Sequence, residues 1–242
     1  MGHFFKHLPR RLFLLVMLAG AALITASSLA YFDFESVPAF VVEKLPVRFE
    51  SLWLASLRIH VTAALVTFPL CIALMTRVLQ RRPVWHRWIG RVTGMAVLLA
   101  LVPTGIVLAF DAKGGKGVTA GFLLSAAIVA WFMVRGVAAA RRRDLVAHSR
   151  AMRHVFAQMS VAVTSRALLI GLDSFGIDPA VAYVVALWGP VLASAAVAEL
   201  VSIHSPLQLV KRICREISPL ALALRVRVRV RSLARPVARA GR

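Results

Sequence analysis

The chain has 242 residues, of which 60% are hydrophobic, and its formal net charge is +20 at pH 7. A soluble globular domain of this length carries a smaller apolar share, so the composition excludes that class and predicts lipid as the solvent. The positive charge lies mainly in connections and in the C-terminal tail, where membrane orientation accounts for it, so no nucleic-acid partner is expected.

Six apolar runs have the length of a membrane-spanning helix, which needs about 20 residues. They cover residues 12–32, 52–75, 92–110, 118–140, 151–172 and 180–201. None shows the short alternating segments of a membrane β-strand. The expected fold class is therefore all-α, a polytopic transmembrane helix bundle of about six spans embedded in a lipid bilayer.

Basic residues gather in alternate connections between these runs, whereas the intervening connections hold most of the acidic residues. The positive-inside rule then predicts that both the N-terminus and the C-terminus lie in the cytoplasm. The predicted organisation is a basic N-terminal segment over 1–11, a six-span domain over 12–201 and a basic tail over 202–242.

Both ends of the chain leave alternatives open. The basic start, the first apolar run and the small residues at 28–30 also fit a cleavable signal peptide, although the length of the run favours a retained span. The tail contains RVRVRVR at 225–231. It fits a partly disordered, solvated segment and equally one that contacts anionic lipid headgroups.

Ionisable residues inside the apolar runs are candidate functional residues, because a charge in hydrocarbon costs several kcal/mol. In the second run, His60 shares a face with Thr67 and Cys71, about 12 Å below the outer boundary. His86 lies at the cytoplasmic entrance of the third run, within WHRWIGR. It fits either a site residue or an ordinary residue of the membrane interface.

The fifth run carries a polar stripe on one helical face. His148, Met152, Met159 and Arg166 are spaced by four, seven and seven residues. His148 and Arg166 are therefore about 27 Å apart along a helix, nearly the hydrocarbon thickness. Arg166 should lie at a depth near that of His60. The methionines of such a stripe serve packing more often than ligation.

A second face of the fifth run holds His154, Gln158 and Ser165, rotated by about 120° from the first. Periodicity does not say which of the two faces turns toward His86. In the sixth run, Glu199 lies near the cytoplasmic end, where it fits a site or simple interfacial pairing with a basic connection.

These residues together resemble a family of predicted bacterial integral membrane proteins, grouped as domain of unknown function 2306, over about residues 55–200. The similarity rests on His60, His86, Arg87, Gly90, Arg91, His148, Met152, Arg166 and Glu199. Ser149 departs from the pattern, which usually has arginine there. The resemblance implies a multipass protein of the bacterial cytoplasmic (inner) membrane and supplies no established activity.

One function that fits is binding of haem b for membrane electron transfer. Two histidines on facing helices at one depth can ligate haem iron, and arginine can pair with its propionates. His86 with His148 or His154 offers one such pair. A second, outer haem lacks a second histidine, so His60 and Arg166 would instead receive an anionic headgroup or a quinone.

The other function that fits is non-redox: a small transporter, a lipid-binding protein or an assembly factor. The histidines would then orient helices, relay protons or bind a metal through His86, His148 and His154. No HExxH, G-x-S-x-G or phosphate-loop pattern occurs. Catalytic residues, the substrate, the redox partner and the oligomeric state are therefore left open, and so is the question whether the protein is an enzyme.

Overall fold

The computed structural model describes residues 8–32, 41–42, 46–47 and 49–202. Within these ranges the chain forms helices and turns and no strand. Contacts divide the chain into a unit of residues 1–198 and a unit of residues 199–242. RVRVRVR and nearly all of the basic tail lie outside the described residues, so lipid contact by the tail stays a prediction.

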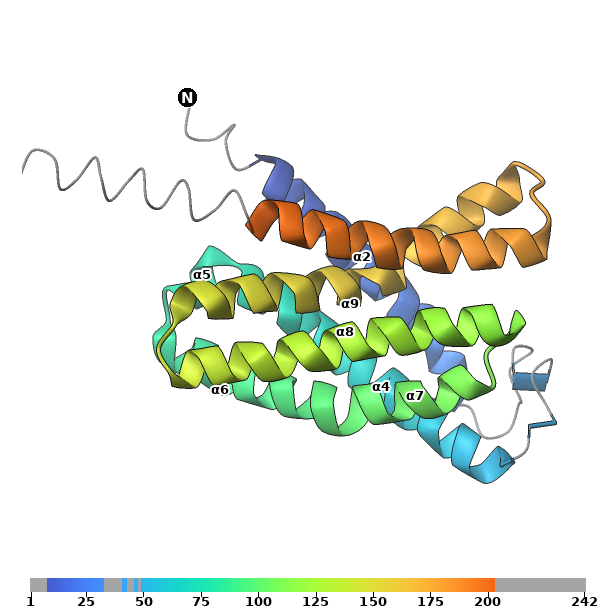
Figure 1. Cartoon of the computed structure of the whole chain (residues 1–242), viewed down its shortest axis with the longest axis horizontal. Coiled ribbons are helices and arrows are strands. Elements are labelled where there is room, and N and C mark those ends of the chain that lie inside the picture. The colour runs from blue at the N-terminus through green and yellow to red at the C-terminus, as the bar shows by residue number, and fades with distance from the viewer. Residues whose placement is uncertain (1–7, 33–40, 43–45, 48, 203–242) are drawn as a thin grey trace, which may run out of the picture. The chain divides into compact units, whose positions relative to one another are not determined.

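Among the described residues, six helices are long and apolar enough to cross a membrane, which confirms the predicted fold class. The labelled elements in chain order are α2 (Leu8–Ser28), η1 (Leu29–Phe32), α4 (Glu50–Met75), α5 (Arg77–Gln80), α6 (Pro83–Ala96), η2 (Val97–Leu101), α7 (Val102–Phe110), α8 (Gly115–Arg141) and α9 (Leu145–Ser174) (Figure 1). The last helix is Pro179–Ser202.

The third span, Pro83–Phe110, is the one that differs most from its predicted bounds. It begins at Pro83 rather than near residue 92, because proline is favoured in the first helical turn and here occupies it. WHRWIGR is therefore helical, and His86 sits inside the first turns of the span. The span consists of α6, the single π-helical segment η2 and α7, without a break.

Helices α8 and α9 pack along one another as an antiparallel hairpin (Figure 1). The turn between them is short, and the Asp144 side chain accepts a hydrogen bond from the backbone N–H of Ala147, which starts α9. The main core joins α2, α4, the third span, α8 and α9; it includes Met17, Phe68, Val97, Met133 and Val155.

Large apolar side chains also cover the outside of the bundle. Leu99 is 77% exposed, Leu23 is 73% exposed and Phe110 is 68% exposed. A water-soluble protein rarely exposes continuous apolar surface of this kind, so these faces are suited to lipid.

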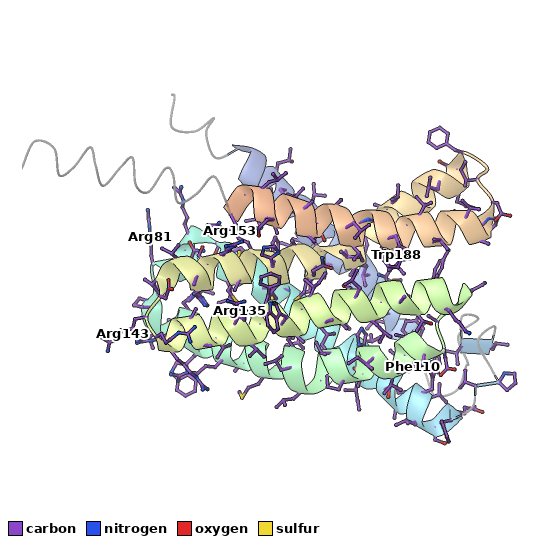
Figure 2. The ribbon with its side chains drawn as sticks, in the orientation of Figure 1. Arg81, Phe110, Arg135, Arg143, Arg153 and Trp188 are labelled. Carbon is purple, nitrogen blue, oxygen red and sulfur yellow. The ribbon has the colours of Figure 1, made fainter. Side chains whose placement is uncertain are left out.

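The ends of the main bundle differ in character. Arg81, Arg143 and Arg153 lie toward one end, whereas Phe110 and Trp188 lie toward the other (Figure 2). We call the end with α5 and the α8–α9 turn the basic end, and the end with the α7–α8 turn the far end. The positive-inside rule predicts that the basic end is cytoplasmic.

Candidate functional site

His148 lies in the first turns of α9 at the basic end and is held by α8. Its Nδ1 atom is 2.9 Å from the carbonyl oxygen of Gly136. Because a carbonyl can only accept, Nδ1 donates, and Nε2 is the ring nitrogen left with a lone pair. A Cβ atom at Gly136 would run into the Met152 methyl group and would lie 3.1 Å from the Ala151 Cβ. A glycine at this position therefore allows the close approach of α8 and α9.

His86 lies near His148, close enough for the two rings to interact electrostatically. The His86 Nδ1 atom is buried and has no hydrogen-bond partner. Two turns deeper on the same face, Thr93 is 2% exposed and its hydroxyl also has no partner. Between them, a Cβ atom at Gly90 would meet nothing within 4 Å. The structure thus brings together His86 and His148 beside a face of α6 with unsatisfied polar atoms.

The second polar face of α9 has a different environment. The His154 ring, 4% exposed, stacks on Phe132 of α8 with 3.9 Å between centroids and 5° between planes. Gln158, 3% exposed, accepts a hydrogen bond from Ser125 at 3.0 Å. Its amide donates to the Val191 carbonyl at 3.0 Å and to the Ser194 hydroxyl at 3.1 Å. This face therefore joins α8, α9 and the last helix.

A metal site of three or more ligands is not formed. Within the described ranges, no group of three His, Cys, Asp or Glu side chains could hold a metal ion. His86, His148 and His154 are therefore not gathered into one set of ligands.

The methionines of the predicted stripe serve packing. Met152 fills the space beside Gly136. The Met159 sulfur accepts a contact of 3.5 Å from the buried Cys71 thiol, joining α9 to α4. Both are adaptable apolar side chains that fill gaps between helices.

His60 of α4 is held by the third span. Its Nδ1 atom is 3.0 Å from the Leu101 carbonyl oxygen and 3.2 Å from the Thr104 hydroxyl. A Cβ atom at Gly105 would lie 3.0 Å from His60 Cε1, so glycine allows the ring to approach. Leu101 ends the π-helical segment η2, and Pro103 in the next turn lacks an N–H donor. The imidazole N–H is an additional donor to a carbonyl two residues before this proline.

Arg166 lies in the far half of α9 and is exposed. One of its guanidinium nitrogens donates to the Ala162 carbonyl at 2.8 Å. Its charge acts electrostatically on the His60 ring of α4 and on the Tyr183 phenol of the last helix. A shared site of His60 and Arg166 stays a prediction.

Glu199 lies in the last turn of the helix Pro179–Ser202 and is half-buried. It belongs to the second compact unit, of which four residues are described. A functional role for Glu199 stays a prediction.

Residues 57–202 match the model of a family described as predicted membrane protein (DUF2306). The chain belongs to this family. The match confirms the resemblance seen in the sequence, and it contains every candidate residue named above. The DUF2306 description states a membrane location and no activity. No curated protein and no solved structure matches the chain.

Three features of this DUF2306 protein were not predicted from the sequence. Tyr183 was not singled out, although it is one of only two tyrosines in an otherwise apolar chain. The roles of Gly105 and Gly136 depend on neighbouring helices. The π-helical segment had one local signal, Pro103 in the middle of an apolar run.

Proposed function

We propose that this protein binds haem b near its basic end, where His86 and His148 would hold the haem iron, and carries electrons within the bacterial cytoplasmic membrane. The observation that supports the proposal most strongly is the buried, unpartnered Nδ1 atom of His86 beside His148. A buried polar atom without a hydrogen bond costs roughly 1–3 kcal/mol, so a group that engages the His86 ring would recover stability.

His148 has the arrangement that metal-bound histidines usually have. One ring nitrogen donates to a backbone carbonyl, which orients the ring and leaves the other nitrogen for the metal. His154 was the alternative ligand; its ring stacks on Phe132 of α8, on the other polar face of α9. His148 is therefore the preferred partner of His86.

The surroundings of His86 also suit a large, partly charged cofactor. The open space beside Gly90 allows a flat group to approach the α6 backbone. Arg87 and Arg91 are exposed in the same turns and would attract the propionate groups of a haem. When bound, haem supplies one-electron chemistry, while these residues hold and orient it.

A second candidate function is a non-redox membrane protein in which the polar residues only position helices. It is favoured by one observation: His60, His148 and Gln158 each hydrogen-bond to a backbone carbonyl of another helix. A small transporter, a lipid-binding protein or an assembly factor would fit this arrangement. His86 distinguishes the two functions, because helix positioning gives its Nδ1 atom no partner.

The visible spectrum of the purified full-length protein, expressed with ample haem, tests the proposal. We expect a Soret band, and α and β bands after reduction. His86→Ala should abolish these bands, and it should leave the thermal unfolding midpoint of the haem-free protein nearly unchanged, because the His86 Nδ1 atom gives up no hydrogen bond. His154→Phe is the matched control; it retains a ring against Phe132 and should retain the bands.

Two results would overturn the haem proposal. One is a wild-type protein that carries no haem under these conditions. The other is a pair of folded variants, His86→Ala and His148→Ala, that both keep the wild-type spectrum.

A further inference from the structure

The length of α8 places one of its arginines at the edge of the hydrocarbon. Lys113 and Lys116, both exposed, keep the α7–α8 turn in water or among head groups, because a charge in hydrocarbon costs several kcal/mol. Arg135 lies about 29 Å along the helix from Lys116, and the hydrocarbon is about 30 Å thick. Arg135, in the half of α8 nearer the basic end (Figure 2), is therefore at the depth of lipid phosphate and ester groups.

The third span gives the same depth independently. Phe110 ends this span before the α7–α8 turn, and Arg91 lies about 28 Å before it along the span. The Arg91 guanidinium carbon is 5.3 Å from the Trp88 ring centroid. The Arg135 guanidinium carbon is at the same distance, 5.3 Å, from the Trp131 ring centroid. Because tryptophan is enriched at membrane interfaces, the two pairs mark where the head groups begin on both helices.

The Arg135–Trp131 pair faces the lipid rather than the bundle. Trp131 is 59% exposed, Val134 is 55% exposed, and Arg135 is also exposed. The opposite side of α8 holds Met133, which is 3% exposed and lies beside Gly94 of α6. Arg135 forms no hydrogen bond and no ion pair with the residues that the structure describes. Its charge is thus available to a group outside the described chain.

This pair combines the donors and the apolar surface that a phospholipid needs. A guanidinium stacked on a ring keeps its planar set of N–H donors free, and these match the oxygens of a phosphate. Stacking also holds the long side chain in one position, so less conformational freedom is lost on binding. Toward the middle of the membrane, Ala127 and Leu124 continue the exposed face of α8, where an acyl chain can lie.

We propose that Arg135 and Trp131 form a binding site for the phosphate group of an anionic phospholipid, whose acyl chains lie along α8. Charge complementarity supports an anionic lipid, since a zwitterionic lipid carries its own cation next to the phosphate. A carboxylate on a partner helix fits less well, because Arg135 lies at the depth of phosphate groups rather than near the centre of a span. The inference goes beyond electron transfer and does not rest on haem.

Quenching of tryptophan fluorescence tests the site in the full-length protein reconstituted into bilayers. Phosphatidylglycerol and phosphatidylcholine with brominated acyl chains are compared at equal mole fraction, because bromine quenches a tryptophan that it contacts. The Trp131 signal is the difference between the wild type and Trp131→Phe. We expect phosphatidylglycerol to have about fivefold higher relative affinity beside Trp131, the factor that corresponds to about 1 kcal/mol for one basic residue near the membrane surface.

Arg135→Gln should abolish this preference, because it removes the charge and keeps a polar side chain. Arg142→Gln is the matched control: it removes the same charge from the same helical face, about 10 Å beyond Arg135 and outside the hydrocarbon. It should keep the preference, and so should Arg135→Lys, which retains a positive charge. Arg135→Met provides the same test as Arg135→Gln with another unbranched side chain, should the glutamine variant fail to fold.

Three results would overturn the inference. One is equal quenching by the two lipids in the wild type, which would mean that charge does not select the lipid at this face. Another is an equal loss of preference in Arg135→Gln and Arg142→Gln, which would assign the preference to the overall charge of the basic end. The third is the absence of quenching by either lipid, which would mean that another protein chain covers Trp131.

Discussion

The basic end and the far half of the bundle contain the same local construction. In each, an imidazole Nδ1 donates to a backbone carbonyl of a neighbouring helix: His148 to Gly136, and His60 to Leu101. In each, a glycine lets the helices approach, Gly136 in one case and Gly105 in the other. This hydrogen bond orients the imidazole ring and leaves its Nε2 atom unused. It does not by itself determine what binds there.

The His148 and His60 rings differ in the side chains that surround them. His148 has a second imidazole nearby, His86, and two imidazoles suit a transition metal such as haem iron. His60 instead experiences the charge of the Arg166 guanidinium, and a cationic donor suits ligand oxygens rather than a metal. The same histidine-to-carbonyl hydrogen bond thus orients rings in two different surroundings. The residues around His148 and those around His60 can be altered independently.

The largest effect on haem content is expected from replacing His148 by asparagine, with the same replacement of His60 for comparison. His148→Asn keeps an N–H donor for the Gly136 carbonyl but provides no ring nitrogen for iron, so the haem bands should disappear. His60→Asn makes the same exchange at the other level and should leave them intact. Absorbance spectra of the two purified variants check this. Equal loss of haem in both would show that the two levels are not independent.

Gly136→Val should be the next largest change. The new side chain would meet Met152 and Ala151, and such overpacking costs about 1–3 kcal/mol. Because Gly136 also accepts the hydrogen bond from His148, we expect a lower thermal unfolding midpoint together with reduced haem content. Gly105→Ala is the counterpart beside His60, and it should leave the haem content unchanged. A haem content unchanged by Gly136→Val would contradict the role given to this glycine.

Pro103→Ala should have an intermediate effect, confined to the surroundings of His60. An alanine restores the missing N–H and permits η2 to return to regular α-helix, which would move Leu101 relative to His60. We expect the Nδ1 resonance of His60 to shift, because its hydrogen bond to the Leu101 carbonyl changes. Nitrogen NMR of histidine-labelled protein measures this shift, and an unaltered haem spectrum is the control. An unchanged resonance would mean that the π-helical turn does not position His60.

The smallest effect is expected from Gln158→Leu. Gln158 joins α8, α9 and the last helix, between the two levels. Hydrogen bonds between membrane helices contribute about 0.6 kcal/mol each on average, so unfolding in detergent should become easier by about 1–2 kcal/mol. Haem content should stay at the wild-type value. A loss of haem would assign Gln158 a role beyond holding the helices together.

Much of the bundle could be predicted from the sequence, because membrane spans are specified by local composition. The six apolar runs correspond to the six long helices, and the main error was the start of the third span. That error arose from reading hydropathy alone, since Pro83 and the amphipathic turns after it are already helical. The two faces of α9 followed from the helical repeat, whereas a shared site of His60 and Arg166 stays a prediction from their depths.

The neighbours of each polar face of α9 were determined by tertiary structure. The spacing of His148 and His154 shows that they lie on different faces of α9. Only helix packing places His148 near His86 and stacks His154 on Phe132. The carbonyls of Gly136 and Leu101 carry no signal in the sequence, since every residue has one. The electrostatic effect of Arg166 on Tyr183 likewise depends on how α9 and the last helix are placed. Helix periodicity is local, whereas the order and rotation of helices arise from contacts between residues far apart in the chain.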